Sequence, residues 1–207
     1  MATRKGGKGS RGGTYAPEET RRLLLEAALK LFEENGYHAT SVEQIVSTAG
    51  VTKGAFYYHF DNKLDVLLQI QDDYIDNRLR NCVRIIASTD DPTEQLRELI
   101  LEALIGIDRY RAQVAIFLQE RRFLVGERFS AIKEKRDAVD GIYEEVLRRG
   151  IEQGAFNSAL SPRIAGFGIL GMCAWAYNWY QPAGRLGIKE IADQLTSLVI
   201  DGVRPRP

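Results

Sequence analysis

The sequence has few of the residues that build disulfide frameworks and metal sites. Its 207 residues include two cysteines and two histidines, and the cysteines do not form a Cys-x-x-Cys pair. This excludes a disulfide scaffold and a cysteine zinc site, and it fits the reducing environment of the cytoplasm. With only His38 and His59, we expect no metal site, no other cofactor and no histidine-based catalytic triad.

The chain also lacks net charge, because 28 Lys and Arg residues balance 28 Asp and Glu residues. The whole protein therefore does not attract nucleic acid, and any attraction must come from a local patch. Residues 1–13 are basic and rich in glycine but lack the apolar core of a secretory signal. We expect residues 1–15 to form a flexible arm that either lies along DNA or is a mere tail.

One uncharged run, residues 164–184, is about as long as a membrane span. It contains Asn178, Gln181, Pro182 and four glycines, and it has few large aliphatic residues. A helix that is apolar on most sides is more often buried between protein surfaces. We therefore expect a cytoplasmic protein without a membrane partner, and we expect this run to lie at an interface.

Period-two alternation is absent over any useful length, whereas apolar residues recur at helical spacing along most of the chain. Side chains suited to capping helix N-termini stand at Ser41, Thr52, Asp91 and Ser161. The sequence predicts an all-α fold, with a three-helix domain at 16–64 and a second helical domain at 65–207. Helices are expected near 63–87, from 92 through at least 107, and near 111–124, 128–153, 161–180 and 188–203.

Two sequence patterns could suggest an enzyme, but neither has the context that catalysis requires. The glycines at 166, 168 and 171 match a dinucleotide-binding fingerprint, but a helix start rather than a strand precedes them. They indicate instead that another helix or a ligand approaches the backbone closely. The carboxylates lie on amphipathic helices with basic partners, as at Glu144 and Arg148, which is typical of a solvated face. We find no catalytic constellation and expect no enzyme.

Residues 40–63 carry the clearest functional signal. They predict a helix, a tight turn at 49–51 and a second short helix, which is the helix-turn-helix arrangement. On the second helix, Phe56 and Phe60 are four residues apart and can anchor it to the core. Its outer face then carries hydroxyls, one lysine and small residues, which can enter a major groove. A purely structural helical hairpin is the alternative.

Residues 50–63, with the letters GVTKGAFYYHFDNK, resemble the signature of the TetR family of transcriptional regulators. The helix stop at Gly36 and Tyr37 and the threonine at 40 before Ile45 also fit, so the resemblance covers about residues 18–68. The rest of the chain fits only as an all-helical domain. The resemblance implies a homodimeric repressor that binds a palindromic operator and releases it when a small molecule enters the C-terminal domain.

The resemblance also assigns DNA contacts by position. It implies that one lysine, one small residue and one tyrosine face base edges, that Gly54 allows close approach, and that a second set contacts phosphates. The base-facing residues are Lys53, Ala55 and Tyr58, and the phosphate-contacting residues are Thr40, Thr52, Tyr57, His59 and Lys63.

The run of residues 175–184 is similar to a pattern in the branch of this family that senses CoA thioesters. An apolar ligand needs an aromatic lining with a few polar groups. The candidate ligand-binding residues are Phe117, Arg121, Tyr143, Trp175 and Trp179.

Helices 161–180 and 188–203 are apolar beyond one stripe, which predicts a two-fold four-helix dimer interface. Three alternatives stay open beside the repressor released by a CoA thioester. They are an efflux-pump repressor released by hydrophobic drugs, a helical-bundle enzyme acting on acyl substrates, and an architectural DNA binder without an effector.

Overall fold

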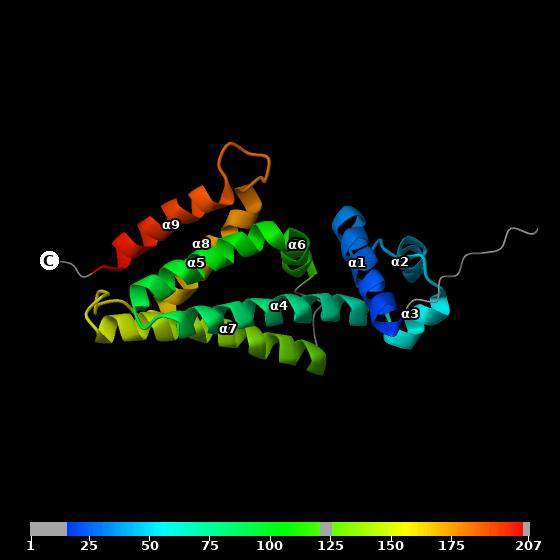
Figure 1. Cartoon of the computed structure of the whole chain (residues 1–207), viewed down its shortest axis with the longest axis horizontal. Helices are drawn as coiled ribbons and strands as arrows, with labels where there is room; N and C mark the ends of the chain where they lie inside the picture. Colours follow the sequence, from blue (N-terminus) through cyan, green and yellow to red (C-terminus); the bar gives the residue numbers. More distant parts are fainter. Residues whose placement is uncertain (1–15, 121–125, 205–207) are drawn as a thin grey trace, which may run out of the picture. The chain divides into compact units, whose positions relative to one another are not determined.

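The computed structural model describes residues 16–120 and 126–204, and within these ranges the chain is entirely helical apart from turns and loops (Figure 1). The arm predicted at 1–15 and the end of the helix predicted at 111–124 lie outside the described residues. The helices are α1 (Pro17–Asn35), α2 (Val42–Ala49), α3 (Lys53–His59), α4 (Lys63–Ser88), α5 (Pro92–Arg109), α6 (Arg111–Glu120), α7 (Glu127–Glu152), α8 (Pro162–Trp179) and α9 (Ile188–Val203).

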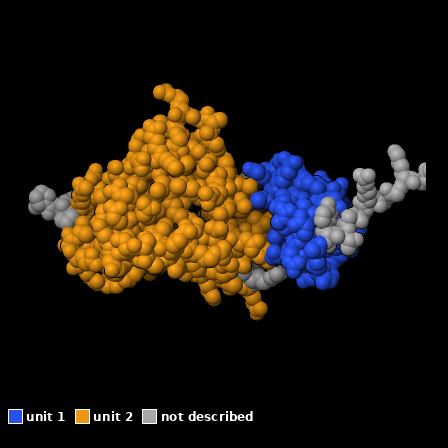
Figure 2. Space-filling view, viewed as in Figure 1, with its two compact units in different colours: residues 1–67 blue, residues 68–207 orange. Residues whose placement is uncertain are grey.

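The chain divides into two compact units, Met1–Leu67 and Leu68–Pro207 (Figure 2). Short-range side-chain signals start the helices in both. Ser41 Oγ accepts a hydrogen bond from the Gln44 backbone N–H, and the Gln44 side chain accepts one in return, which completes a capping box. The side chains of Thr52, Asp91 and Ser161 each accept a hydrogen bond from a first-turn backbone N–H and so cap α3, α5 and α8. These predictions are confirmed.

The first unit is a three-helix core in which α1 packs against α2 and α3. Its centre is formed by fully or almost fully buried apolar side chains, namely Leu24, Phe32, Ile45, Phe56 and Phe60. Gly50 turns the chain between α2 and α3 with φ at 69°, a left-handed conformation that favours glycine. This sharp turn directs α3 away from α2 and produces the helix-turn-helix.

In the second unit, α5 packs against α7, α8 and α9 (Figure 1). One face of α5 is completely enclosed, with Leu96, Leu99, Ile100 and Leu104 inaccessible to solvent. The helix α8 packs on α7 through Gly166, where an added Cβ would lie 3.7 Å from the Cβ of Tyr143. The predicted close helix approach is therefore present at Gly166. It is absent at Gly168 and Gly171, which lie on the exposed side of α8.

Both cysteines, Cys82 and Cys173, are buried free thiols. Burial is the main cause that raises the pKa of each thiol to about 11. In the described ranges, no group of His, Cys, Asp and Glu side chains is arranged to hold a metal ion. None of the helices described is long and apolar enough to cross a membrane.

Candidate DNA-binding face and effector cavity

The short helix α3 has one buried and one exposed side. Phe56 and Phe60 are buried, with ring centroids 5.8 Å apart, and they attach the helix to the three-helix core. The opposite side projects Tyr57, which is 51% exposed, and Tyr58, which is 76% exposed. These two exposed phenol side chains therefore lie on the side of α3 that is turned away from the three-helix core.

Lys53 begins α3 and forms an exposed ion pair with Glu43 of α2. The hydrogen bond between them lowers the pKa of the Glu43 carboxyl and raises that of the Lys53 ammonium. Since both side chains are exposed, solvent screens the pair and its contribution to stability is small. Lys53 is therefore charged and able to exchange its carboxylate partner for another anion.

Four more of the predicted DNA-contacting residues lie on or beside this face. Thr52 is exposed, and its hydroxyl accepts a hydrogen bond from the Ala55 N–H. A Cβ at Gly54 would meet only Thr52 Oγ1, at an ordinary 3.8 Å, so packing within the protein does not require glycine there. Ala55 and His59 are half-buried, and the His59 ring lies edge-on to Tyr58.

The remaining two predicted DNA contacts face the protein. Thr40 is 2% exposed, and its hydroxyl donates to the carbonyl oxygens of Leu31 and Gly36 at the end of α1. Lys63 Nζ donates to the carbonyl oxygens of Tyr37 and Thr40 at 2.6 and 2.5 Å. Both side chains therefore hold the 36–40 segment that follows α1, and the Thr40 hydroxyl also satisfies carbonyl groups left at the α1 terminus.

A cavity lies within the second unit, between α4, α5, α6, α7 and α8. It has an inner chamber of about 150 Å³ and an outer chamber of about 570 Å³. Both chambers are lined by Arg78 of α4, by Phe117 of α6, and by Arg136 and Asp140 of α7. Apolar side chains form much of the remaining lining, namely those of residues such as Ile75, Ile107, Val114, Val139 and Leu170, and Lys133 and Asp137 also line the outer chamber.

The two arginines in this cavity differ in environment. Burial is the main cause that lowers the pKa of Arg136 to about 10, so it still carries a proton at neutral pH. Its guanidinium carbon lies 3.5 Å from the centre of the Phe117 ring. Burial also acts to lower the pKa of Arg78, but surrounding groups including Tyr74 and Glu102 raise it overall.

The predicted ligand-binding residues do not converge on this cavity. Phe117 lines it, whereas Tyr143 is fully buried and its hydroxyl donates to the Leu99 carbonyl at 2.7 Å. Trp175 and Trp179 are 66% and 47% exposed, because α8 turns their side away from α7. Arg121 lies outside the described residues.

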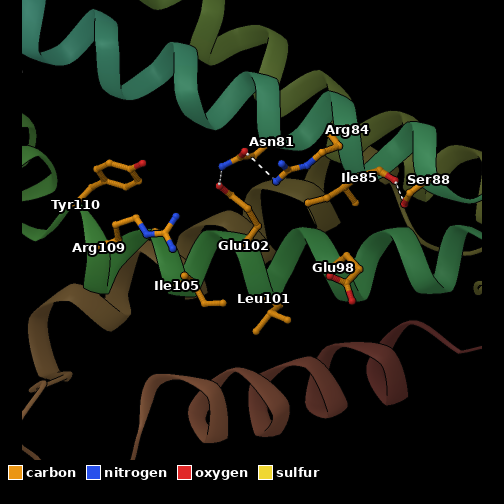
Figure 3. A pocket seen from close by; sticks show the side chains of 11 residues that line it. Asn81, Arg84, Ile85, Ser88, Glu98, Leu101, Glu102, Ile105, Arg109 and Tyr110 are labelled. Carbon is orange, nitrogen blue, oxygen red and sulfur yellow. Dashed lines mark hydrogen bonds between the residues drawn. The ribbon is translucent and has the colours of Figure 1, made fainter.

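A second hollow of about 450 Å³ lies between α4 and α5 (Figure 3). Asn81 donates to Glu102 Oε1 at 3.0 Å and accepts from Arg84 at 3.1 Å, whereas Glu102 Oε2 is buried and has no hydrogen-bond partner among the described residues.

Sequence reasoning missed Arg78 and Arg136. Arginines on amphipathic helices are usually solvated, so the sequence carries little signal for their burial. A partial signal is that Tyr74 and Arg78, like Arg136 and Asp140, stand four residues apart and share a helix face.

Comparison with known protein families finds a match in each of the two units. Residues 24–70 match the family described as "Bacterial regulatory proteins, tetR family". Residues 89–203 match the family described as "Tetracyclin repressor-like, C-terminal domain". The second match alone covers more than half of the chain.

Individual relatives of the chain are regulators of the same family. The chain is 34% identical over 185 residues to the HTH-type transcriptional repressor KstR2 of Rhodococcus jostii (strain RHA1), covering 88% of this chain and 90% of that protein. The structure of the ketosteroid transcriptional regulator KstR2 of Mycobacterium tuberculosis superposes with a TM-score of 0.82 at 29% identity, covering 90% of this chain and 95% of that one. AibR, solved in complex with isovaleryl coenzyme A and operator DNA, superposes with a TM-score of 0.78 at 28% identity, covering 86% and 97%.

Proposed function

Since this chain belongs to the TetR family of transcriptional regulators, which are not enzymes, we propose that it is a repressor that binds a palindromic operator as a homodimer and releases it on binding a CoA thioester. The observation that carries the proposal is the similarity to AibR, whose structure holds both isovaleryl coenzyme A and operator DNA. Membership in this family of regulators rules out the alternative that the chain is a helical-bundle enzyme acting on acyl substrates.

The exposed side of α3 supports the DNA-binding part of the proposal. Lys53, Ala55 and Tyr58 are assigned to base edges, because they lie at the start and on the outer side of this helix. The hydroxyls and imidazole of Thr52, Tyr57 and His59 are assigned to phosphates, and Gly54 to close approach of the backbone to DNA. We leave Thr40 and Lys63 out of this face, because the Thr40 hydroxyl binds the end of α1 and Lys63 binds backbone carbonyls of the 37–40 segment.

An unpartnered apolar surface on α8 and α9 supports the homodimer. It contains side chains between 47% and 73% exposed, which are Ile164, Phe167, Trp175, Trp179 and Leu198. A surface this apolar is costly in water, and a second copy of the same helices would cover it with two-fold symmetry. In such a dimer, Trp175 and Trp179 would lie at the interface. They would contact a ligand only if the ligand also reached the second copy.

The cavity supports an effector site in each copy. It is concave and combines apolar walls with charged side chains, and ligand sites usually join an apolar lining to polar groups that fix the ligand's orientation. Its two arginines also disfavour the alternative of an efflux-pump repressor released by cationic drugs. Release follows if the ligand binds better to a conformation in which the two α3 helices no longer match the operator half-sites.

The test begins with selecting DNA sequences that the purified protein binds, followed by mobility shifts on the recovered site. We expect a palindrome, and we expect Lys53→Ala to weaken discrimination between sites while Lys30→Ala, an exposed lysine on α1, does not. CoA thioesters with aliphatic, aromatic and steroid-derived acyl groups are then titrated beside the free acids. Release by a CoA thioester that is lost in Phe117→Ala, which changes the wall of the cavity, supports the proposal. Release only by cationic drugs contradicts it.

A further inference from the structure

The two chambers of the effector cavity meet at a pair of guanidinium groups. Arg78 and Arg136, together with Phe117 and Asp140, line the inner chamber and the outer chamber alike, so they stand where the chambers adjoin. A ligand that fills either chamber therefore passes within reach of these side chains.

Both guanidinium groups have unused hydrogen-bonding capacity. The Nε atoms of Arg78 and Arg136 are buried and have no acceptor among the described residues. A terminal nitrogen of Arg136 reaches Gln71 Oε1 at 3.4 Å, which is a long hydrogen bond. Buried donors in native proteins nearly always have acceptors, and an unpaired buried cation destabilises the fold. Such a pair needs a functional explanation.

The nearby carboxylates form no direct ion pair with the two arginines among the described residues. Asp140 interacts electrostatically with both arginines but forms no ion-pair contact with either, and burial is the main cause that raises the pKa of its carboxyl, which disfavours its negative form. Asp137 is bound to the exposed Lys133. Glu102 contributes to the charge of Arg78 from a distance, but its hydrogen-bond donor is Asn81.

We propose that Arg78 and Arg136 jointly bind an anionic group, a carboxylate or a phosphate, carried by an apolar ligand that occupies the two chambers. Guanidinium groups present paired N–H donors that match both oxyanions, and binding there would satisfy the two buried Nε atoms. The apolar walls accommodate the rest of the ligand. This inference rests on the proposed effector function and specifies the charge that the effector must carry.

The test uses the full-length protein without DNA and a set of ten-carbon probes. Decanoate, decyl phosphate, decanol and decylamine are compared by isothermal titration calorimetry. We expect the two anions to bind at least tenfold more tightly than decanol, and decylamine to bind most weakly. Decanoyl-CoA and the CoA thioester of decanedioic acid then identify the anion's source. If the thioester of decanedioic acid binds more tightly than decanoyl-CoA, the arginines bind its free carboxylate. If the two bind equally, the arginines bind a phosphate of CoA.

Variants locate the site. Arg136→Met and Arg78→Met should each reduce decanoate affinity at least tenfold while leaving decanol unchanged, and Arg136→Lys should lose less. Arg148→Met is the matched control, because Arg148 is an exposed arginine on the same helix, paired with Glu145 and Glu152. Without ligand, the Met variants should unfold at the same temperature as wild type or higher, since an unpaired buried cation is removed.

Two results would overturn the inference. One is equal binding of decanoate and decanol to wild type. The other is a loss of thermal stability in Arg136→Met and Arg136→Lys with unchanged decanoate affinity, which would make the arginine a structural group. The proposed function fails separately, because it requires operator release. Arginine-dependent anion binding without any release would overturn the repressor mechanism and leave this site intact.

Discussion

Gly150, near the end of α7, is held against a buried aromatic ring, and replacing it tests the packing of the effector unit. A Cβ at this position would lie 2.1 Å from Cδ2 and 2.3 Å from Cε2 of Phe156. The ring is 2% exposed, and the Phe156 N–H donates to the Gly150 carbonyl at 3.0 Å. The ring therefore cannot move aside without breaking local packing, and Gly150→Ala must distort the α7 terminus.

The expected magnitude combines two opposing effects. Overpacking a filled core costs about 3 kcal/mol at the upper end of its usual range, which suits so short a contact. Alanine in place of glycine inside a helix returns about 1 kcal/mol. We expect Gly150→Ala to lose about 2 kcal/mol of unfolding free energy. Gly141, on the same helix, has open space around its Cβ position, so Gly141→Ala should gain about 1 kcal/mol.

The assay is thermal unfolding followed by circular dichroism, with urea unfolding as a second measure. For a domain of this size, each kcal/mol shifts the melting temperature by about 2–4 °C. Gly150→Ala should therefore melt about 4–8 °C below wild type, and Gly141→Ala about 2–4 °C above it. If Gly150→Ala is as stable as Gly141→Ala, the packing of Phe156 on α7 is wrong.

Two further predictions concern the DNA-binding face and the dimer. Glu43→Gln should release Lys53 and increase non-specific DNA affinity, with a salt dependence steeper by up to about one ion, measured by fluorescence anisotropy. Glu34→Gln, which removes the same charge on α1, should do so less, and equal effects would show that net charge alone acts. Leu198→Asp should give monomers in light scattering at micromolar concentration, whereas Val83→Asp, an exposed apolar site on α4, should not. A persistent dimer in Leu198→Asp moves the interface elsewhere.

The sequence predicts the helices well, because their signals are short-range. A capping side chain such as Ser41 or Thr52 acts on a backbone group three residues away, so its effect does not depend on tertiary structure. The inward side of α3 is equally predictable. Phe56 and Phe60 are the large apolar residues at helical spacing, and hydroxylated aromatics remain for the outside.

The effector site is less predictable, because periodicity groups residues on a face without saying which partner that face meets. Trp175 and Trp179 share a face of α8, but α8 turns Gly166 toward α7 and leaves the tryptophans exposed. Arg78 and Arg136 become neighbours only because α4 and α7 line one cavity, and no local pattern encodes that meeting.

The two buried thiols have a practical consequence for following this protein at work. Cys82 and Cys173 are enclosed, and because burial raises their pKa to about 11, they are almost entirely unreactive thiols at neutral pH. A thiol-specific label should therefore react mainly with a single engineered cysteine, for instance Tyr58→Cys on the exposed side of α3, and only slowly with the native cysteines. A spin label or fluorophore there would report how far apart two α3 helices stand in a dimer. Slow labelling of the native thiols would record how often the second unit opens.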